Sequence, residues 1–170
     1  MSLPVTPSAT LTFRELLDYT EAEAARWEEY FARHPEGLDF SFAEGSTATV
    51  RGLVQHVFAV ERRYADRLNG EPLSDYAAVP TGSAEALFAA GREARARLER
   101  FLARASDADL ARRHTFETLR AGTQAATGRK IVAHALMHAV RTWAQLATVV
   151  RQHGAPTEGR HDLLFSNALA

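Results

Sequence analysis

Apolar side chains recur at helical spacing along four long segments of the chain. Within each segment they follow the i, i+3, i+4, i+7 rule, which places them on one face of an α-helix. The linkers between the segments carry the Gly, Pro and Ser residues that are typical of loops. Amphipathic helices of this length bury their apolar faces against one another. The sequence therefore predicts an all-α four-helix bundle with long crossover connections and with helices at residues 11–33, 48–68, 84–104 and 129–152.

Residues that favour helix ends flank these segments. Thr12 and Glu15 have the spacing of a capping box, and Ser83 stands where it can cap the third segment. Pro35 and Gly70 follow the first two segments, and neither residue continues a helix readily. These end signals agree with the boundaries that the periodicity predicts.

The linker at residues 105–128 is longer than the others. Its residues 114–119 alternate only weakly between polar and apolar side chains. This pattern fits either a short pair of strands or an irregular excursion over the bundle.

The bulk composition limits what the chain can bind. Its 170 residues fit a single domain spanning residues 1–170. The 20 basic and 21 acidic residues leave a net charge of −1, so neither nucleic acid nor an anionic membrane is an expected partner. Because the chain has no cysteine, any metal must be bound by histidine, carboxylate, carbonyl or water. There is no signal peptide and no apolar run of about 18 residues, so the expected location is the cytoplasm.

The last helical segment is apolar on more than one face. Ile131, Ala135 and Leu146 follow one stripe, whereas Leu136 and Trp143 lie outside it. Such a wide apolar surface predicts burial on more than one side, either by the bundle itself or by a partner subunit.

Three of the seven histidines stand where they could bind a metal. His134 and His138 are four residues apart, which puts both rings on one face of the last helix. His56 lies at the edge of the apolar stripe of the second helix and could supply a third ligand. Three protein ligands with an open position are typical of a catalytic zinc-type site. A single histidine in such a place is more often a boundary residue bonded to a carbonyl or to water.

Other metal and catalytic motifs are missing. The chain has no H-E-x-x-H sequence, so the helix of the zinc proteases is absent. Its only Glu-x-x-His pair, Glu158 and His161, lies in a Gly- and Pro-flanked tail, which excludes a carboxylate-bridged di-iron bundle. No Gly-rich phosphate loop and no nucleophile elbow is present.

Two segments resemble helices of the DinB/YfiT-like family of four-helix bundles. The segment GLVQHVFAVERRYADRL resembles the family's second helix, and IVAHALMHAVRTWAQLATVVRQHG resembles its last helix. The resemblance implies a metal site of three histidines, one from the second helix and two at i and i+4 in the last helix. His56 would be the first of these ligands.

The last helix departs from the family pattern at the second of its two ligand positions. Residues 143–145 stand where the family has Arg-Gly-Gln, so this ligand position falls on Thr142. His138 keeps its place, and His134 stands one turn earlier. Either His134 and His138 form the pair with the ion displaced by about 5.4 Å along the helix, or the site has lost one ligand.

The resemblance implies two alternative functions. One is a metal-dependent enzyme, a thiol-dependent transferase or a hydrolase that acts on a small molecule in stress or detoxification. His56, His134 and His138 would then hold Zn, Ni or Fe, with Gln145, Arg141 or Glu61 close to the ion or substrate. The other is a non-enzymatic bundle with a degenerate metal site, acting in ligand binding or dimerisation. A homodimer is expected in either case, again by resemblance.

Overall fold

The computed structural model describes residues 10–41, 48–118, 122–155, 157 and 161–169. Four long helices account for most of this length: α1 (Phe13–Arg33), α2 (Val50–Asn69), α3 (Ala84–Arg104) and α5 (Gly128–Gln152). The predicted all-α four-helix bundle is thus confirmed, and each helix boundary lies within about two residues of the expected one. None of the described helices is both long and apolar enough to cross a membrane. The shorter elements are η1 (Pro35–Asp39), η2 (Tyr76–Ala78), α4 (Asp107–Ala111), β1 (Arg113–Thr118), β2 (Gly122–Thr127) and η3 (Leu163–Phe165).

The predicted cap residues act as caps. Thr12 and Glu15 form the complete capping box at the start of α1. The Ser83 hydroxyl accepts a hydrogen bond from the Ala86 amide at the start of α3. Gly70 ends α2 with a φ of 71°, a left-handed conformation that glycine adopts without strain.

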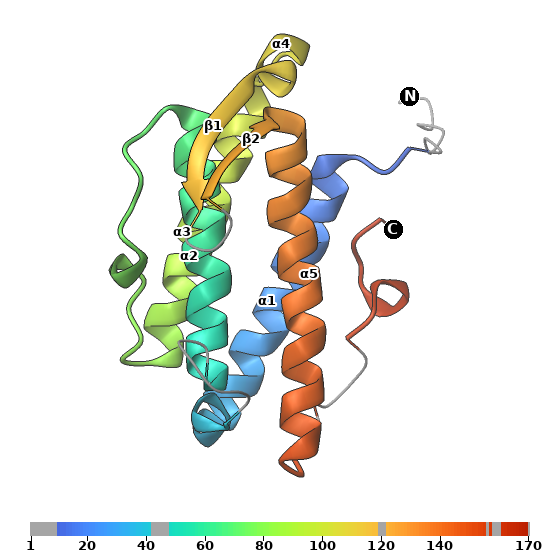
Figure 1. Cartoon of the computed structure of the whole chain (residues 1–170). Helices are drawn as coiled ribbons and strands as arrows, with labels where there is room; N and C mark the ends of the chain where they lie inside the picture. The colour runs from blue at the N-terminus through green and yellow to red at the C-terminus, as the bar shows by residue number, and fades with distance from the viewer. Residues whose placement is uncertain (1–9, 42–47, 119–121, 156, 158–160, 170) are drawn as a thin grey trace, which may run out of the picture.

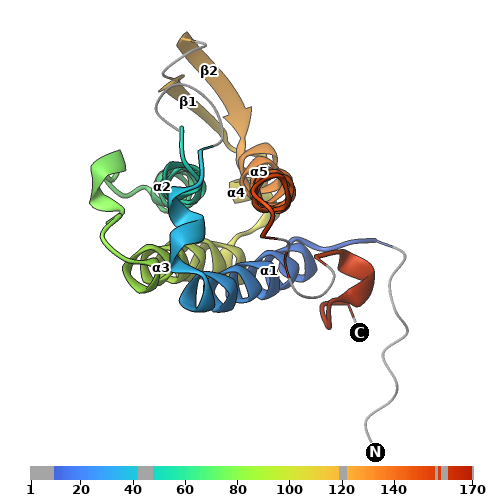
Figure 2. The ribbon, with the colours of Figure 1, turned by 90° about the horizontal axis from the view of Figure 1, so that it is seen from below.

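The four long helices stand at the corners of a square (Figures 1 and 2). α1 and α2 lie diagonally opposite, and each packs against both α3 and α5. α1 and α5 run in one direction and α2 and α3 in the other, as Figure 1 shows. Because α2 and α3 are parallel, residues 70–83 must return along the length of the bundle. This return places η2 beside the middle of α2.

The linker between α3 and α5 contains the strand pair that was one of its two predicted forms. β1 and β2 form an antiparallel hairpin in which Arg113 is opposite Thr127 and Thr118 is opposite Gly122. The side chain of Phe116 on β1 packs edge-on against Tyr64 of α2. The hairpin therefore covers part of the outer side of α2.

The core has two apolar clusters with a polar layer between them. One cluster is built around Trp27, Phe58 and Phe88, and the other contains Leu17 and Leu98. Buried polar residues lie between the two clusters on α1, α2 and α3: Thr20 and Glu23 on α1, Glu61 on α2 and Arg95 on α3.

The wide apolar surface of α5 is covered by the chain itself. Leu136 and Trp143, which lie outside the main stripe, are 0% and 3% exposed. Trp143 packs against Phe58 and Phe88. Burial within the bundle, one of the two predicted explanations, is therefore sufficient to account for this wide apolar surface. The apolar surface of α5 gives no separate support for a dimer.

Gly91 lies where α3 packs tightly against α2. A Cβ atom at this position would lie 2.4 Å from Cε1 of Phe58, a ring that is fully buried. Gly91→Ala is therefore expected to lower the free energy of unfolding by about 1–3 kcal/mol through overpacking, although alanine favours the helix. Gly82→Ala is the matched control, since no described heavy atom lies within 4 Å of its Cβ position. It should change stability by less than about 0.5 kcal/mol. Equal denaturation midpoints for the two variants would contradict the close approach.

Candidate metal centre

His56 and His138 meet between α2 and α5. Their Nε2 atoms are 3.2 Å apart, and the ring centroids are separated by 5.0 Å. His56 is half-buried, whereas His138 is only 9% exposed. The neighbouring residues Val57 and Ala139 belong to the core, which fixes the two helices against each other. Two of the three predicted site residues are therefore brought together by the fold.

Tyr76 holds the other side of the His56 ring. Its hydroxyl oxygen lies 2.9 Å from Nδ1 of His56. Burial raises the pKa of Tyr76 to about 12, so the phenol stays protonated at neutral pH. With the His56 proton on Nδ1 and donated to this oxygen, the Nε2 lone pair points toward His138. Such a second hydrogen bond is the usual way in which a metal-binding histidine is oriented.

His138 is held in its neutral form. Burial, followed by the nearby His56, Arg141 and His134, lowers its pKa to about 4. Its Nδ1 atom is buried and has no hydrogen-bond partner among the described residues. A neutral imidazole is the form that binds a metal ion.

His134 shares the helical face of His138 but does not reach the same point. Its ring centroid is 5.8 Å from that of His138, and its ring packs edge-on against Tyr64. The side chain is exposed. Within the described part of the chain, no group of three His, Asp or Glu side chains is placed to hold one ion.

Two of the three predicted ligands, His56 and His138, have the separation that a metal ion requires. Tetrahedral zinc with Zn–N bonds of 2.0–2.1 Å separates two nitrogen ligands by about 3.3 Å. The observed separation of the Nε2 atoms of His56 and His138 is close to this value. His134 would have to turn about its side-chain bonds to join them. The side chain is exposed, so among the described residues this change of rotamer would give up the edge-on contact with Tyr64 and no burial in the core.

The other residues near the predicted site have different roles. The Thr142 hydroxyl is buried and donates a hydrogen bond to the backbone oxygen of His138, so it faces its own helix. Glu61 points into the core, where it lies 3.4 Å from Arg95. Arg141 is exposed and close enough to His134 and His138 to lower the pKa of each. Gln145 is exposed.

Sequence reasoning missed Tyr76 and Arg95. Tyr76 lies in a linker without periodicity, and only the return of this linker along α2 brings it to His56. Arg95 lies on a helix rich in charged residues, yet its side chain is 3% exposed. The helical period does indicate its burial, because Arg95 follows the buried Gly91 by four positions.

A family model for the DinB superfamily matches residues 19–146. The match begins within α1 and reaches into α5, so it includes both helices of the histidine pair. No curated protein matches the chain. Since the model covers well over half of the sequence, the chain belongs to the DinB superfamily.

Proposed function

We propose that this protein is a metal-dependent enzyme whose divalent ion, Zn, Ni or Fe, is bound by His56, His138 and His134. The main support is the 3.2 Å separation between the Nε2 atoms of His56 and His138. His138 is held in the neutral form that binds a metal, and Tyr76 orients the ring of His56. When bound, the ion would lower the pKa of a thiol or a water molecule and so supply the nucleophile.

The protein residues would prepare the site and the substrate. Tyr76 keeps the His56 ring in place through its hydroxyl oxygen. Arg141, exposed on α5 beside the histidines, could attract the negative end of a small substrate. A thiol-dependent transfer or a hydrolysis, in stress or detoxification, is the reaction class that the family resemblance supports.

Metal content is the direct test of this proposal. Untagged wild-type protein is expected to contain about one divalent ion per chain by elemental mass spectrometry, because the two imidazoles of His56 and His138 already have the separation of two metal ligands. His56→Ala and His138→Ala should each abolish binding. Tyr76→Phe should weaken it by about 10–100-fold, as the loss of an orienting partner does. His34→Ala, which removes the histidine that follows the C-terminal end of α1, should leave metal binding unchanged.

A wild-type chain that stays free of metal after incubation with Zn, Ni or Fe would contradict the proposal. So would metal that is retained in the His56→Ala/His138→Ala double variant, because it would then be bound elsewhere. His134→Ala tests the third ligand. If the metal affinity of this variant equals that of the wild type, His134 is not a ligand.

A non-enzymatic bundle is the second candidate function. It is favoured by Thr142, whose hydroxyl bonds to its own helix at the position where the resemblance places a ligand. In this case the protein would bind a small ligand or form a dimer without metal chemistry. Thr142→His separates the two candidates: tight metal binding that appears only in this variant would show that the natural site is degenerate.

A further inference from the structure

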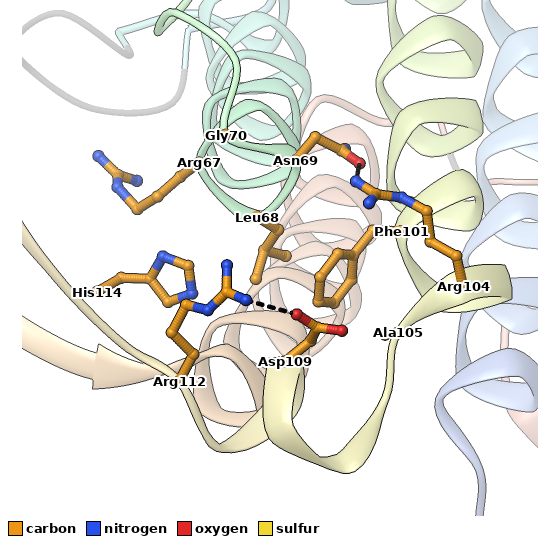
Figure 3. A pocket seen from close by; sticks show the side chains of 10 residues that line it. All are labelled: Arg67, Leu68, Asn69, Gly70, Phe101, Arg104, Ala105, Asp109, Arg112 and His114. Atoms are coloured by element: carbon orange, nitrogen blue, oxygen red, sulfur yellow. Dashed lines mark hydrogen bonds and ion pairs between the residues drawn. The ribbon is translucent and has the colours of Figure 1, made fainter.

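A pocket of about 250 Å³ lies at the end of the bundle, away from the histidine pair. The C-terminal ends of α2 and α3, the turn after α4 and the start of β1 surround it (Figure 3). Leu68 and Phe101, both almost fully buried, form an apolar floor. Figure 3 shows Arg104 on one side of this floor and Arg112 and His114 on the other, whereas the guanidinium of Arg67 is turned away from the floor.

The positive charge of the pocket is only partly neutralised. Three arginines and one aspartate line it, which leaves a formal charge of +2. Arg112 is paired with Asp109 at 2.8 Å, whereas Arg104 donates to the neutral amide oxygen of Asn69. Arg67 lies with its guanidinium carbon 4.2 Å from the centroid of the Phe116 ring. Among the residues that the structure describes, neither Arg67 nor Arg104 forms an ion pair.

Burial and neighbouring positive charge both lower the pKa values of titratable groups in the pocket. Burial, and then Arg112 and Arg67, lower the pKa of His114. Burial is also the largest cause of the lowered pKa of Arg67, and nearby Arg63 adds to it. The carbonyl groups at the C-terminal ends of α2 and α3 favour nearby cations, which is one explanation for the arginines. This effect does not explain the apolar floor or the concave shape of the pocket.

From the pocket's shape and charge, we propose that it binds a small organic anion. This anion has a phosphate or carboxylate group, its head, attached to a compact apolar group, its body. Arg104 binds the head, since a guanidinium presents two parallel donors to a phosphate or carboxylate, and Arg67, on the other side of the floor, adds attraction at longer range. The apolar body lies on Leu68 and Phe101. The pocket is smaller than the 300–1,000 Å³ of typical drug-sized sites, so the body is about the size of one ring.

Phenyl phosphate is the probe for this site. Isothermal titration in the presence of a chelator, so that the metal centre plays no part, is expected to show binding by the wild type. Arg104→Gln should weaken binding about tenfold, the effect of losing one charged hydrogen bond, and Arg67→Gln, which removes only a longer-range attraction, should weaken it less. Arg100→Gln, an exposed arginine of α3 outside the pocket, is the control and should bind as the wild type does. Because Arg104 is exposed, its replacement leaves the core intact.

Two comparisons identify what the pocket recognises. Inorganic phosphate should bind more weakly than phenyl phosphate, because it cannot contact the apolar floor. Benzoate in place of phenyl phosphate distinguishes a carboxylate head from a phosphate head. Absence of binding for both organic anions at millimolar concentration, or equal affinity in wild type and Arg104→Gln, would overturn the proposal.

Discussion

Arg95→Ala is expected to lower the free energy of unfolding by about 3–5 kcal/mol, among the largest effects of any single substitution in this chain. Arg95 and Glu61 are paired at 3.4 Å, with side chains 3% and 1% exposed. Removal of the arginine leaves the Glu61 carboxyl buried without its countercharge. One carboxyl oxygen of Glu61, Oε1, already has no hydrogen-bond partner among the described residues. Urea denaturation monitored by circular dichroism at pH 8, above the folded-state pKa of Glu61, measures the difference.

Arg92→Ala is the matched control for this substitution. Arg92 lies one turn earlier on α3 and pairs with Glu28 at the surface, where its side chain is 54% exposed. An exposed pair contributes only about 0–1 kcal/mol. The double variant Glu61→Leu/Arg95→Met should recover the stability of the wild type, because it removes both buried charges together. If Arg95→Ala were as mild as Arg92→Ala, the buried pair would not have the assigned role.

The stability of the protein is expected to fall as the pH rises from about 4.5 to 7, through Glu61. Burial raises the pKa of Glu61 from 4.5 to about 7, although Arg95 acts in the opposite direction. The folded state therefore holds a proton that the unfolded chain has released. The stabilising contribution of Glu61 is complete at pH values below its pKa in the unfolded chain, 4.5. It is lost once the pH exceeds its pKa in the folded protein, about 7. Each pKa unit corresponds to about 1.4 kcal/mol, so the total change is about 3 kcal/mol.

Glu61→Gln isolates this contribution, because it removes the titrating group and keeps the shape. The difference in unfolding free energy between wild type and Glu61→Gln should change by about 2–3 kcal/mol between pH 5 and pH 8. The neutral His138, whose low pKa makes stability fall at acid pH, is present in both proteins and cancels. A difference that stays constant over this range would show that Glu61 is ionised throughout.

The bundle could be predicted from the sequence because its determinants are local. Helical period, the Thr12–Glu15 capping box and Gly70 all act within a few residues of the backbone that they shape. The i, i+4 spacing likewise placed His134 and His138 on one face of α5. These are relations within one helix, and they hold whatever the helix packs against.

The details of the candidate metal centre depend on how separate helices meet. His56 faces His138 and not His134, which is set by the relative height of α2 and α5. Tyr76 reaches His56 only because α2 and α3 are parallel and the linker between them must return along the bundle. Such tertiary relations have no signature at any fixed spacing in the sequence.

X-ray absorption at the zinc edge of the zinc-loaded wild-type protein identifies the ligands of the proposed ion. We expect scattering from two or three imidazole rings with Zn–N distances of about 2.0–2.1 Å, and fewer imidazoles in His138→Ala. A spectrum without imidazole scattering, or one that is the same in wild type and in the His56→Ala/His138→Ala double variant, would contradict a metal centre between α2 and α5.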